Sequence, residues 1–323
     1  MCTAVTYQGK HHYFGRNLDF EYSYGESVVI TPRNYPFHFR KQELMHTHYA
    51  IIGMAAIDNN YPLYFDGTNE AGLSMAGLYF PGNAVYLPVM EDKDNIAPFE
   101  FIPWVLGQCK NVTEAENLLK KLNMADISYS DKYPLSPLHW LIADKTRAIT
   151  VEPMSNGLNI YDNPIGVLTN NPPFEFHLYN LAYYQNITSQ EVVNRFAPTL
   201  DIAAYSRGMG GIGLPGDLSS PSRFIRAAFT KLSSVSGRYA SSDISQFFHI
   251  LYSVAQQRGC VRVGQGYEET IYTSCCDTDD GVYYYTTYDN AQITSVSLHH
   301  TNLDTDQLIS YPLITGQQIR TQN

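Results

Sequence analysis

Cys2 is the first residue of the chain with catalytic potential. If Met1 is removed, this cysteine carries both a thiol nucleophile and a free α-amine. The amine has a reference pKa of about 7.7–8.0, which suits a general base at neutral pH. One residue would then supply the nucleophile and the base for acyl transfer. Position alone favours an ordinary second residue, so the hypothesis depends on the rest of the sequence.

Arg16 and Asp19 belong to the segment Phe14-Gly-Arg-Asn-Leu-Asp19, which begins in a predicted strand. Two residues three positions apart lie on opposite faces of a regular strand. A bulge or bend would therefore be needed to bring both side chains to one site. The alternative is an ordinary surface pair near a turn.

Asn170 lies at a predicted strand end, in Leu168-Thr-Asn-Asn-Pro-Pro173. Asparagines before prolines are usual turn residues. The side chain could instead donate an uncharged N–H to a developing oxyanion, as acyl-transfer chemistry requires. The residues alone leave both interpretations open.

A glycine-rich segment, Gly208-Met-Gly-Gly-Ile-Gly-Leu-Pro-Gly216, contains the G-x-G-x-x-G spacing. A dinucleotide site would need a helix to begin inside this motif, but Leu-Pro-Gly follows instead. We therefore expect a flexible or tightly turned loop and no bound nucleotide.

We expect the short-spaced histidines to be solvated surface residues and not metal ligands, because none lies in a ligand motif or beside a carboxylate cluster. They are His11, His12, His46, His48, His299 and His300. His139 or His249 could be nominated as the partner of a catalytic cysteine, although no local pattern supports either. We expect neither a metal nor a cofactor.

Composition predicts one folded domain over residues 1–323, since 44% of the residues are hydrophobic and no composition break occurs. The net charge of −10 and the lack of a Lys/Arg-rich run argue against nucleic-acid binding. No signal peptide opens the chain and no apolar run reaches the length of a membrane span. The five cysteines match no zinc or disulfide pattern, which favours the cytoplasm. We expect the four other than Cys2 to be buried: Cys109, Cys260, Cys275 and Cys276.

The elements follow the order strands, helices, strands, helices, strands. Strands are expected at 4–7, 13–16, 27–31, 50–56, 63–66, 73–78, 148–152, 158–161, 166–169, 282–288 and 292–298. Helices are expected at 99–107, at 114–122 after a Thr113 capping box, after an Ser220 N-cap, and from Ser242. Turns are predicted at Asn156-Gly157 and Asp289-Asn290. This order is not regular βαβ alternation, so it predicts an α+β fold with two stacked, largely antiparallel sheets and helices outside.

Five motifs in this order resemble the choloylglycine hydrolases over nearly the whole chain. They are Met-Cys-Thr at the start, Phe14-Gly-Arg-Asn-Leu-Asp19, Asn69-Glu-Ala-Gly-Leu73, Leu168-Thr-Asn-Asn-Pro172 and Gly213-Leu-Pro-Gly-Asp-Leu-Ser-Ser-Pro-Ser-Arg223-Phe. The family comprises bile salt hydrolases and penicillin V acylases. The resemblance implies the four-layer αββα fold of the N-terminal-nucleophile hydrolases, and a homotetramer.

The resemblance also implies a role for each matched residue. Cys2 matches the nucleophile, and Asp19 matches the aspartate that positions it. Arg16 and Arg223 match the two arginines of the site, which would favour the thiolate. Asn170 matches the oxyanion-hole asparagine. The other oxyanion donor falls at Tyr79, through its backbone N–H.

Tyr79 departs from the bile salt hydrolase pattern, in which asparagine is common, and matches the penicillin V acylases. The likeness elsewhere is nearest to the bile salt hydrolases of gut lactic-acid bacteria, notably from Tyr205 to Asp217. The leading hypothesis is therefore hydrolysis of glycine- and taurine-conjugated bile acids, on an apolar floor formed by Phe20, Tyr22, Tyr24 and residues near 60–65 and 130–140. The alternatives are a penicillin V acylase with the same mechanism and an inactive bile-acid or lipid-binding protein.

Overall fold

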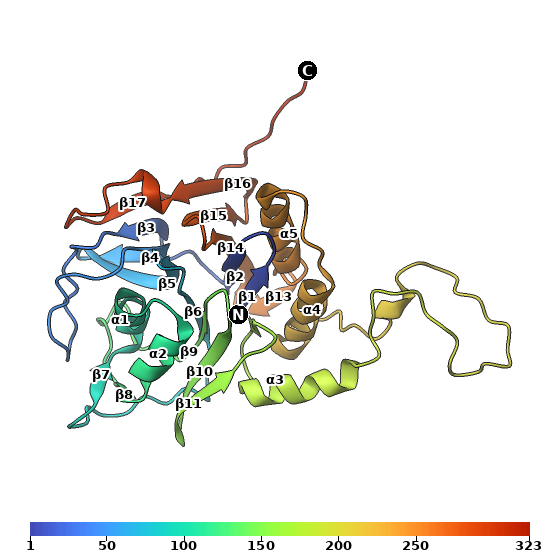
Figure 1. Ribbon diagram of the computed structural model, residues 1–323, viewed down its shortest axis with the longest axis horizontal. Coiled ribbons are helices and arrows are strands. Elements are labelled where there is room, and N and C mark those ends of the chain that lie inside the picture. Colours follow the sequence, from blue (N-terminus) through green and yellow to red (C-terminus); the bar gives the residue numbers. More distant parts are fainter.

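Two antiparallel sheets, stacked face to face, form the centre of the computed structural model, which describes all residues 1–323 (Figure 1). Sheet I contains the N-terminal strand and has the order β12-β1-β2-β14-β15-β16, with β13 paired to β14. Sheet II has the order β11-β10-β9-β6-β5-β4-β3-β17. All neighbours within these two sheets are antiparallel, as the sequence predicts.

The strand bounds are as follows. Sheet I comprises β1 (Cys2–Gln8), β2 (His12–Phe20), β12 (Val167–Leu168), β13 (Val261–Val263), β14 (Gly266–Asp277), β15 (Val282–Thr287) and β16 (Asn290–Ser297). Sheet II comprises β3 (Ser27–Thr31), β4 (Ile51–Asp58), β5 (Tyr61–Asn69), β6 (Ser74–Tyr79), β9 (Leu138–Ala143), β10 (Ala148–Met154), β11 (Gly157–Asp162) and β17 (Ile309–Pro312). A separate parallel pair is formed by β7 (Asp94–Ile96) and β8 (Leu122–Met124).

Helices cover the outer faces of the two sheets (Figure 1). On sheet II these are α1 (Phe101–Gln108) and α2 (Val112–Leu119), and on sheet I they are α4 (Ser220–Ser233) and α5 (Ala240–Tyr252). The shorter α3 (Phe174–Asn180) follows β12. The layers are therefore helix, sheet, sheet, helix, which confirms the expected αββα sandwich. None of these helices is long and apolar enough to cross a membrane.

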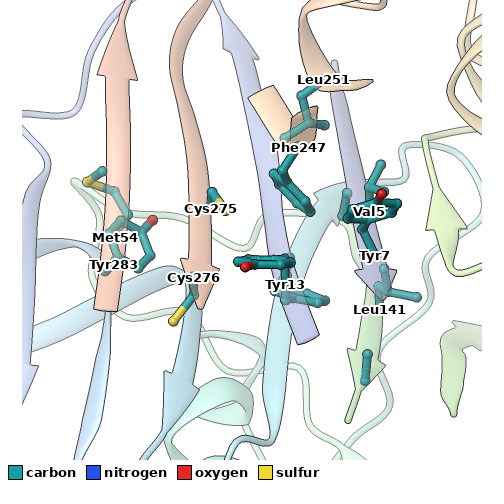
Figure 2. Close-up of a cluster of buried hydrophobic side chains, with 14 of the residues drawn as sticks. Val5, Tyr7, Tyr13, Met54, Leu141, Phe247, Leu251, Cys275, Cys276 and Tyr283 are labelled. Atoms are coloured by element: carbon teal, nitrogen blue, oxygen red, sulfur yellow. The ribbon is translucent and has the colours of Figure 1, made fainter. Parts of the chain in front are cut away.

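One hydrophobic core fills the space between the sheets and continues under α5. Figure 2 shows Met54 of sheet II in this core, with Tyr13 of sheet I and Phe247 of α5. A second core lies between sheet II and α1, where Phe101 packs edge-on against Trp140 with 4.8 Å between the ring centres. Since sheet I is covered on both faces, every residue of β2 from His12 to Asp19 is buried. The polar residues of β2 are thus held in the interior.

Each predicted strand and helix exists, but the helix starts were wrong. α2 begins at Val112 with Asn111 as the N-cap, whose side chain accepts a hydrogen bond from the Glu114 N–H (2.9 Å), so Thr113 lies inside the helix. The N-cap of α4 is Ser219, one residue before Ser220. α5 begins at Ala240, before Ser242. An earlier polar residue with extended backbone takes the cap in the first two helices.

Two hairpins are present where turns are predicted. In the β10–β11 hairpin Met154 pairs with Gly157, so Ser155 and Asn156 form the loop. The β15–β16 hairpin closes at Asp289, with Thr287 paired to Asn290. The glycine-rich segment forms a loop with one short 3-10 helix, Met209–Gly211, as expected.

The surface assignment was wrong for two of the short-spaced histidines. His12 and His48 are buried, and each fills both ring nitrogens with hydrogen bonds to neighbouring oxygens. Conversely, Cys260 is exposed, whereas Cys109, Cys275 and Cys276 are buried as expected. A short spacing between two histidines therefore does not show that both are exposed.

Acid should destabilise this fold through His12 and His177, because burial lowers the pKa of each to about 4. In the unfolded chain a histidine has a pKa of about 6.5. Between these values the unfolded chain binds protons that the folded chain does not, so the free energy of unfolding falls as the pH drops from about 6.5 to about 4. The loss reaches about 3 kcal/mol per histidine at most. Urea unfolding at about pH 7.5 and about pH 5 measures it, and equal stability at the two values would contradict the prediction.

Candidate active site

Cys2 is the first residue of β1 and pairs with Leu18 of β2. Its side chain is buried between the two sheets, where the Arg16 guanidinium donates from Nη2 to Sγ (2.5 Å). Alternation along β1 turns Thr3 to the opposite face, toward α4. The Cys2 thiol therefore faces the space between the sheets, while Arg223 of α4 reaches the Cys2 carbonyl from the outer face of sheet I.

Arg16 brings a positive charge to the thiol. Its other side-chain hydrogen bonds go to main-chain carbonyls, those of Asn17 (3.3 Å), Phe65 (3.1 Å) and Gly77 (2.5 Å). No carboxylate forms a salt bridge with it, so its charge is free to stabilise a thiolate. Burial alone would lower the pKa of Arg16, yet nearby negative groups, led by Cys2, raise it above its ordinary value.

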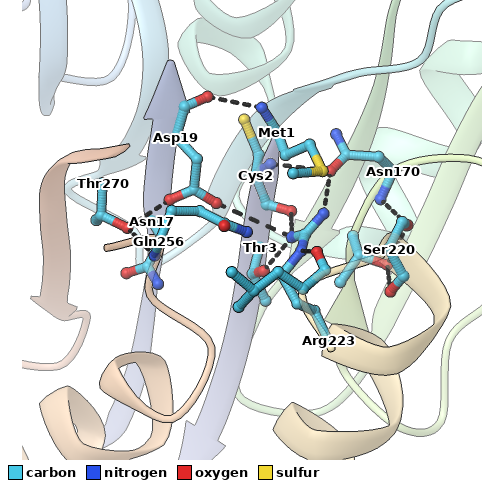
Figure 3. Close-up of polar contacts among 12 residues, drawn as sticks. Met1, Cys2, Thr3, Asn17, Asp19, Asn170, Ser220, Arg223, Gln256 and Thr270 are labelled. Carbon is cyan, nitrogen blue, oxygen red and sulfur yellow. Dashed lines mark hydrogen bonds and ion pairs between the residues drawn. The ribbon is translucent and has the colours of Figure 1, made fainter. Parts of the chain in front are cut away.

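Asp19 and Arg223 lie on the other face of sheet I, and both are fully buried (Figure 3). Arg223 donates from Nη1 to the Cys2 carbonyl (2.5 Å) and to Thr3 Oγ1 (2.7 Å), and lies 4.0 Å from Asp19 Oδ2. The Thr270 hydroxyl donates to Asp19 Oδ1 (2.6 Å), while Oδ2 accepts no hydrogen bond. Burial raises the pKa of the Asp19 carboxyl, and the Arg223 charge opposes this rise.

The expected bulge is not in β2. Residues 12–18 of this strand pair with β1 without a register shift, so Arg16 and Asp19 do lie on opposite faces. The irregularity is in the partner strand β14, between Thr270 and Tyr272. Arg16 reaches the Cys2 thiol from one face, whereas Asp19 lies on the other face beside Arg223, which binds the Cys2 carbonyl.

Asn170 connects Cys2 to the loop that follows β6. Its Oδ1 accepts from the Cys2 main-chain nitrogen (2.9 Å) and from Arg223 Nη2 (2.7 Å). These two donors fix the orientation of the amide, so Nδ2 points away from them and donates to the Tyr79 carbonyl (2.6 Å). An amide nitrogen has two hydrogens, which leaves one for a further acceptor.

The Tyr79 main chain faces the same space. The Phe80 N–H donates to the Pro137 carbonyl, so by the alternation of an antiparallel ladder the polar groups of Tyr79 point away from β9. On that other side β5 pairs with β6 only as far as Ala76. The carbonyl of Tyr79 accepts from Asn170, and its N–H therefore points to the side where Cys2 and Asn170 lie.

Met1 occupies the end of β1 in this structure. Its ammonium donates to the Asp19 carbonyl oxygen (2.7 Å) and contacts the buried carboxylate of Glu268. Burial lowers the pKa of this amine. Sequence reasoning did not find Glu268 or Thr270, because both lie on β14, an irregular strand that no periodic pattern predicts.

A cavity of about 360 Å³ opens beside Cys2 and Arg16. Its lining is mostly apolar and aromatic. From the predicted set it includes Phe20, Tyr22, Tyr24, Leu63, Phe65, Tyr133 and Leu138, and outside that set Phe99, Ile102 and Tyr129. Tyr79 lines the cavity and is 41% exposed. An acyl group with a broad apolar surface fits such a lining, and its carbonyl would reach the thiol.

The profile of the choloylglycine hydrolase family of linear amide C–N hydrolases matches residues 2–311. The chain belongs to this family. It is 57% identical to a bile salt hydrolase/transferase of Lactiplantibacillus plantarum, over the full length of both proteins. Its structure superposes on the C2A mutant of the Clostridium perfringens conjugated bile acid hydrolase with a TM-score of 0.93, at 37% identity and complete coverage of both chains.

A penicillin V acylase from Agrobacterium tumefaciens shares the fold, with a TM-score of 0.77 at 18% identity, covering 98% of this chain and 94% of that one. Membership of the choloylglycine hydrolase family confirms the enzyme class read from the five motifs. All of the residues carried over from that resemblance, Cys2, Arg16, Asp19, Tyr79, Asn170 and Arg223, meet around the N-terminus in the structure.

Proposed function

We propose that this enzyme hydrolyses the amide bond of glycine- and taurine-conjugated bile acids, with Cys2 as the nucleophile after removal of Met1. One observation carries the proposal: the Cys2 thiol lies against Arg16 and lines a mostly apolar cavity of about 360 Å³. Relatives named as bile salt or conjugated bile acid hydrolases cover the full chain at 37–57% identity, which supports the choice of substrate.

In the first step the Cys2 α-amine takes the thiol proton, and the sulfur attacks the amide carbonyl. The Cys2 nitrogen already donates to Asn170 Oδ1, so this residue and Asp19 would hold the free amine in place. Arg16 stabilises the thiolate on one face. Arg223 fixes the Cys2 main chain and balances the charge of Asp19 on the other.

The oxyanion then forms between two N–H donors, the free hydrogen of Asn170 Nδ2 and the Tyr79 main-chain amide. The α-amine passes its proton to the leaving nitrogen, and glycine or taurine departs. The bile acyl group remains on Cys2 as a thioester. Water, activated by the same amine, hydrolyses the thioester and regenerates the thiol.

A paired assay tests the substrate. With taurocholate, glycocholate and penicillin V at equal concentration under reducing conditions, we expect faster amine release from the two bile salts. The reason is the size of the apolar cavity, which a flat phenoxyacetyl group would not fill. Faster cleavage of penicillin V would instead identify an acylase.

The penicillin V alternative is favoured by Tyr79, because the residue matches the penicillin V acylase pattern and its side chain lines the cavity. A Tyr79→Asn variant, assayed in parallel, should keep the order of the three substrates, since the main-chain N–H of residue 79 is unchanged. A reversed order in this variant would make the side chain the specificity determinant. The inactive-binder alternative predicts that alkylation of Cys2 leaves bile-acid binding intact and that there is no turnover to lose.

We also propose a homotetramer in the cytoplasm. An arm, residues 188–210, projects from the body between α3 and α4 (Figure 1). It exposes apolar side chains, among them Val193, Phe196 and Tyr205, with Phe196 fully exposed. Such side chains gain stability when a neighbouring copy covers them. Light scattering of the native protein measures the number of copies in the assembly. The cytoplasmic location is supported by the five free cysteines, which suit a reducing compartment.

A further inference from the structure

Two buried histidines hold consecutive carbonyls at the strand end that carries Asn170. His139 of β9 places Nε2 2.9 Å from the Thr169 carbonyl oxygen. His177 of α3 places Nε2 2.9 Å from the Asn170 carbonyl oxygen. Both histidines are fully buried, and neither touches the cavity beside Cys2. They approach the same two peptide groups from different elements.

The tautomer of His177 follows from its partners. A carbonyl only accepts, so Nε2 must carry the hydrogen. Nδ1 is buried and has no partner, and burial lowers the pKa of the ring to about 4, so the imidazole is neutral at physiological pH. The ring is stacked on Phe224 of α4, with 4.7 Å between the centres. His177 is therefore a fixed, uncharged donor to the main chain of Asn170.

His139 has a hydrogen-bond partner at each ring nitrogen. Nε2 donates to the Thr169 carbonyl, while Nδ1 lies 2.9 Å from Glu152 Oε1. Glu152 also accepts from the Phe174 N–H (3.1 Å). One proton must therefore lie between Nδ1 and Oε1. This buried pair holds β9, β10 and the start of α3 against the strand end.

The two histidines contact the main chain next to both proposed oxyanion donors, Asn170 and Tyr79. His139 is stacked on Phe80, with 4.2 Å between the ring centres and 5° between the planes, and Phe80 follows Tyr79. Ser220 Oγ accepts from the Asn170 N–H (2.8 Å). Hence the Asn170 main chain is fixed at N–H and C=O, and the Tyr79 peptide is fixed through its neighbour.

We infer that His139 and His177 are positioning residues for the oxyanion hole, setting the direction in which Asn170 Nδ2 and the Tyr79 N–H point. The inference rests on the proposed amide hydrolysis only in that an oxyanion forms at these donors. Donors to an oxyanion act through their direction and distance, so a small displacement lowers the rate without weakening substrate binding. An apolar pair of the same volume would pack equally well here but would leave both carbonyls unpaired.

The test compares His177→Phe, which keeps volume and removes the donor, with His177→Gln, which retains an N–H donor. His12→Phe is the matched control, because His12 is equally buried and lies on β2 away from Asn170. For each folded variant one measures kcat and KM on any amide that the wild type cleaves, the melting temperature, and the rate at which iodoacetamide alkylates Cys2. His139→Gln is measured as well. It provides a second test if His177→Phe does not fold.

We expect His177→Phe to lose about tenfold to a hundredfold in kcat, with KM and the alkylation rate within about twofold of wild type. His177→Gln should recover most of the kcat that His177→Phe loses. His139→Gln should retain most of the wild-type kcat. His12→Phe should lower the melting temperature and leave kcat unchanged. A kcat of His177→Phe within about twofold of wild type, or an equal loss in His12→Phe, or an equal loss in the alkylation rate, would overturn the inference. A wild type that cleaves penicillin V and no bile salt would overturn the proposed substrate and leave this comparison valid.

Discussion

Replacement of Cys2 by alanine is expected to lower kcat for glycocholate by about 10⁴-fold or more, since no other side chain of the site can form the acyl intermediate. The cavity and the oxyanion donors remain, so bile-acid binding should change little. Cys2→Ser should also lose most of its activity, because Arg16 stabilises a thiolate far more readily than an alkoxide. Initial rates and equilibrium binding to the same protein measure both effects.

The control for this substitution is Cys260→Ser, which removes an exposed thiol and should leave kcat unchanged. Intact mass of the active wild type should lack Met1, because the scheme needs the free α-amine of Cys2. Full activity in the Cys2→Ser variant, or in protein that retains Met1, would contradict the mechanism.

The residues that gather around Cys2 could be named from the sequence because the resemblance to the choloylglycine hydrolases rests on short local motifs. Arg16 and Asp19 lie three residues apart on one strand, and Arg223 lies in the first turn of a helix marked by its own Ser-Pro signal. What could not be predicted is why opposite faces of β2 serve one site. The reason is that Cys2 is the first residue of β1, so side chains from both faces of sheet I can contact it: Arg16 from one face and Arg223 from the other.

Six strands were missed, and the two longest of them, β9 and β14, lack a clean period; the other four, β7, β8, β13 and β17, have three or four residues each. β9 is buried on both faces over nearly its whole length and therefore lacks alternation. β14 is long and interrupted by the irregularity at Ile271. Both carry residues that matter here: His139 lies on β9, and Thr270 and Glu268 lie on β14. A buried histidine on an aperiodic strand leaves no signal in one sequence.

Asn170 is expected to show the second large effect. Asn170→Ala removes one oxyanion donor, so kcat should fall by about 10²–10³-fold while KM changes little. The same substitution also removes the acceptor for the Cys2 nitrogen and for Arg223. Asn170→Asp separates the two roles, because a carboxylate keeps both acceptor bonds and loses the N–H donor.

Asn170→Asp should be slower than Asn170→Ala, since a negative charge would face the developing oxyanion in a buried site. The melting temperature of Asn170→Asp should stay near that of the wild type, since the hydrogen bonds from the Cys2 nitrogen and Arg223 persist. Asn171→Ala is the matched control, because its side chain donates to the Pro81 carbonyl at the surface and not to Tyr79. If Asn170→Asp were as active as the wild type, the oxyanion would have to bind elsewhere, and the orientation of the Asn170 amide derived from Cys2 and Arg223 would have no catalytic meaning.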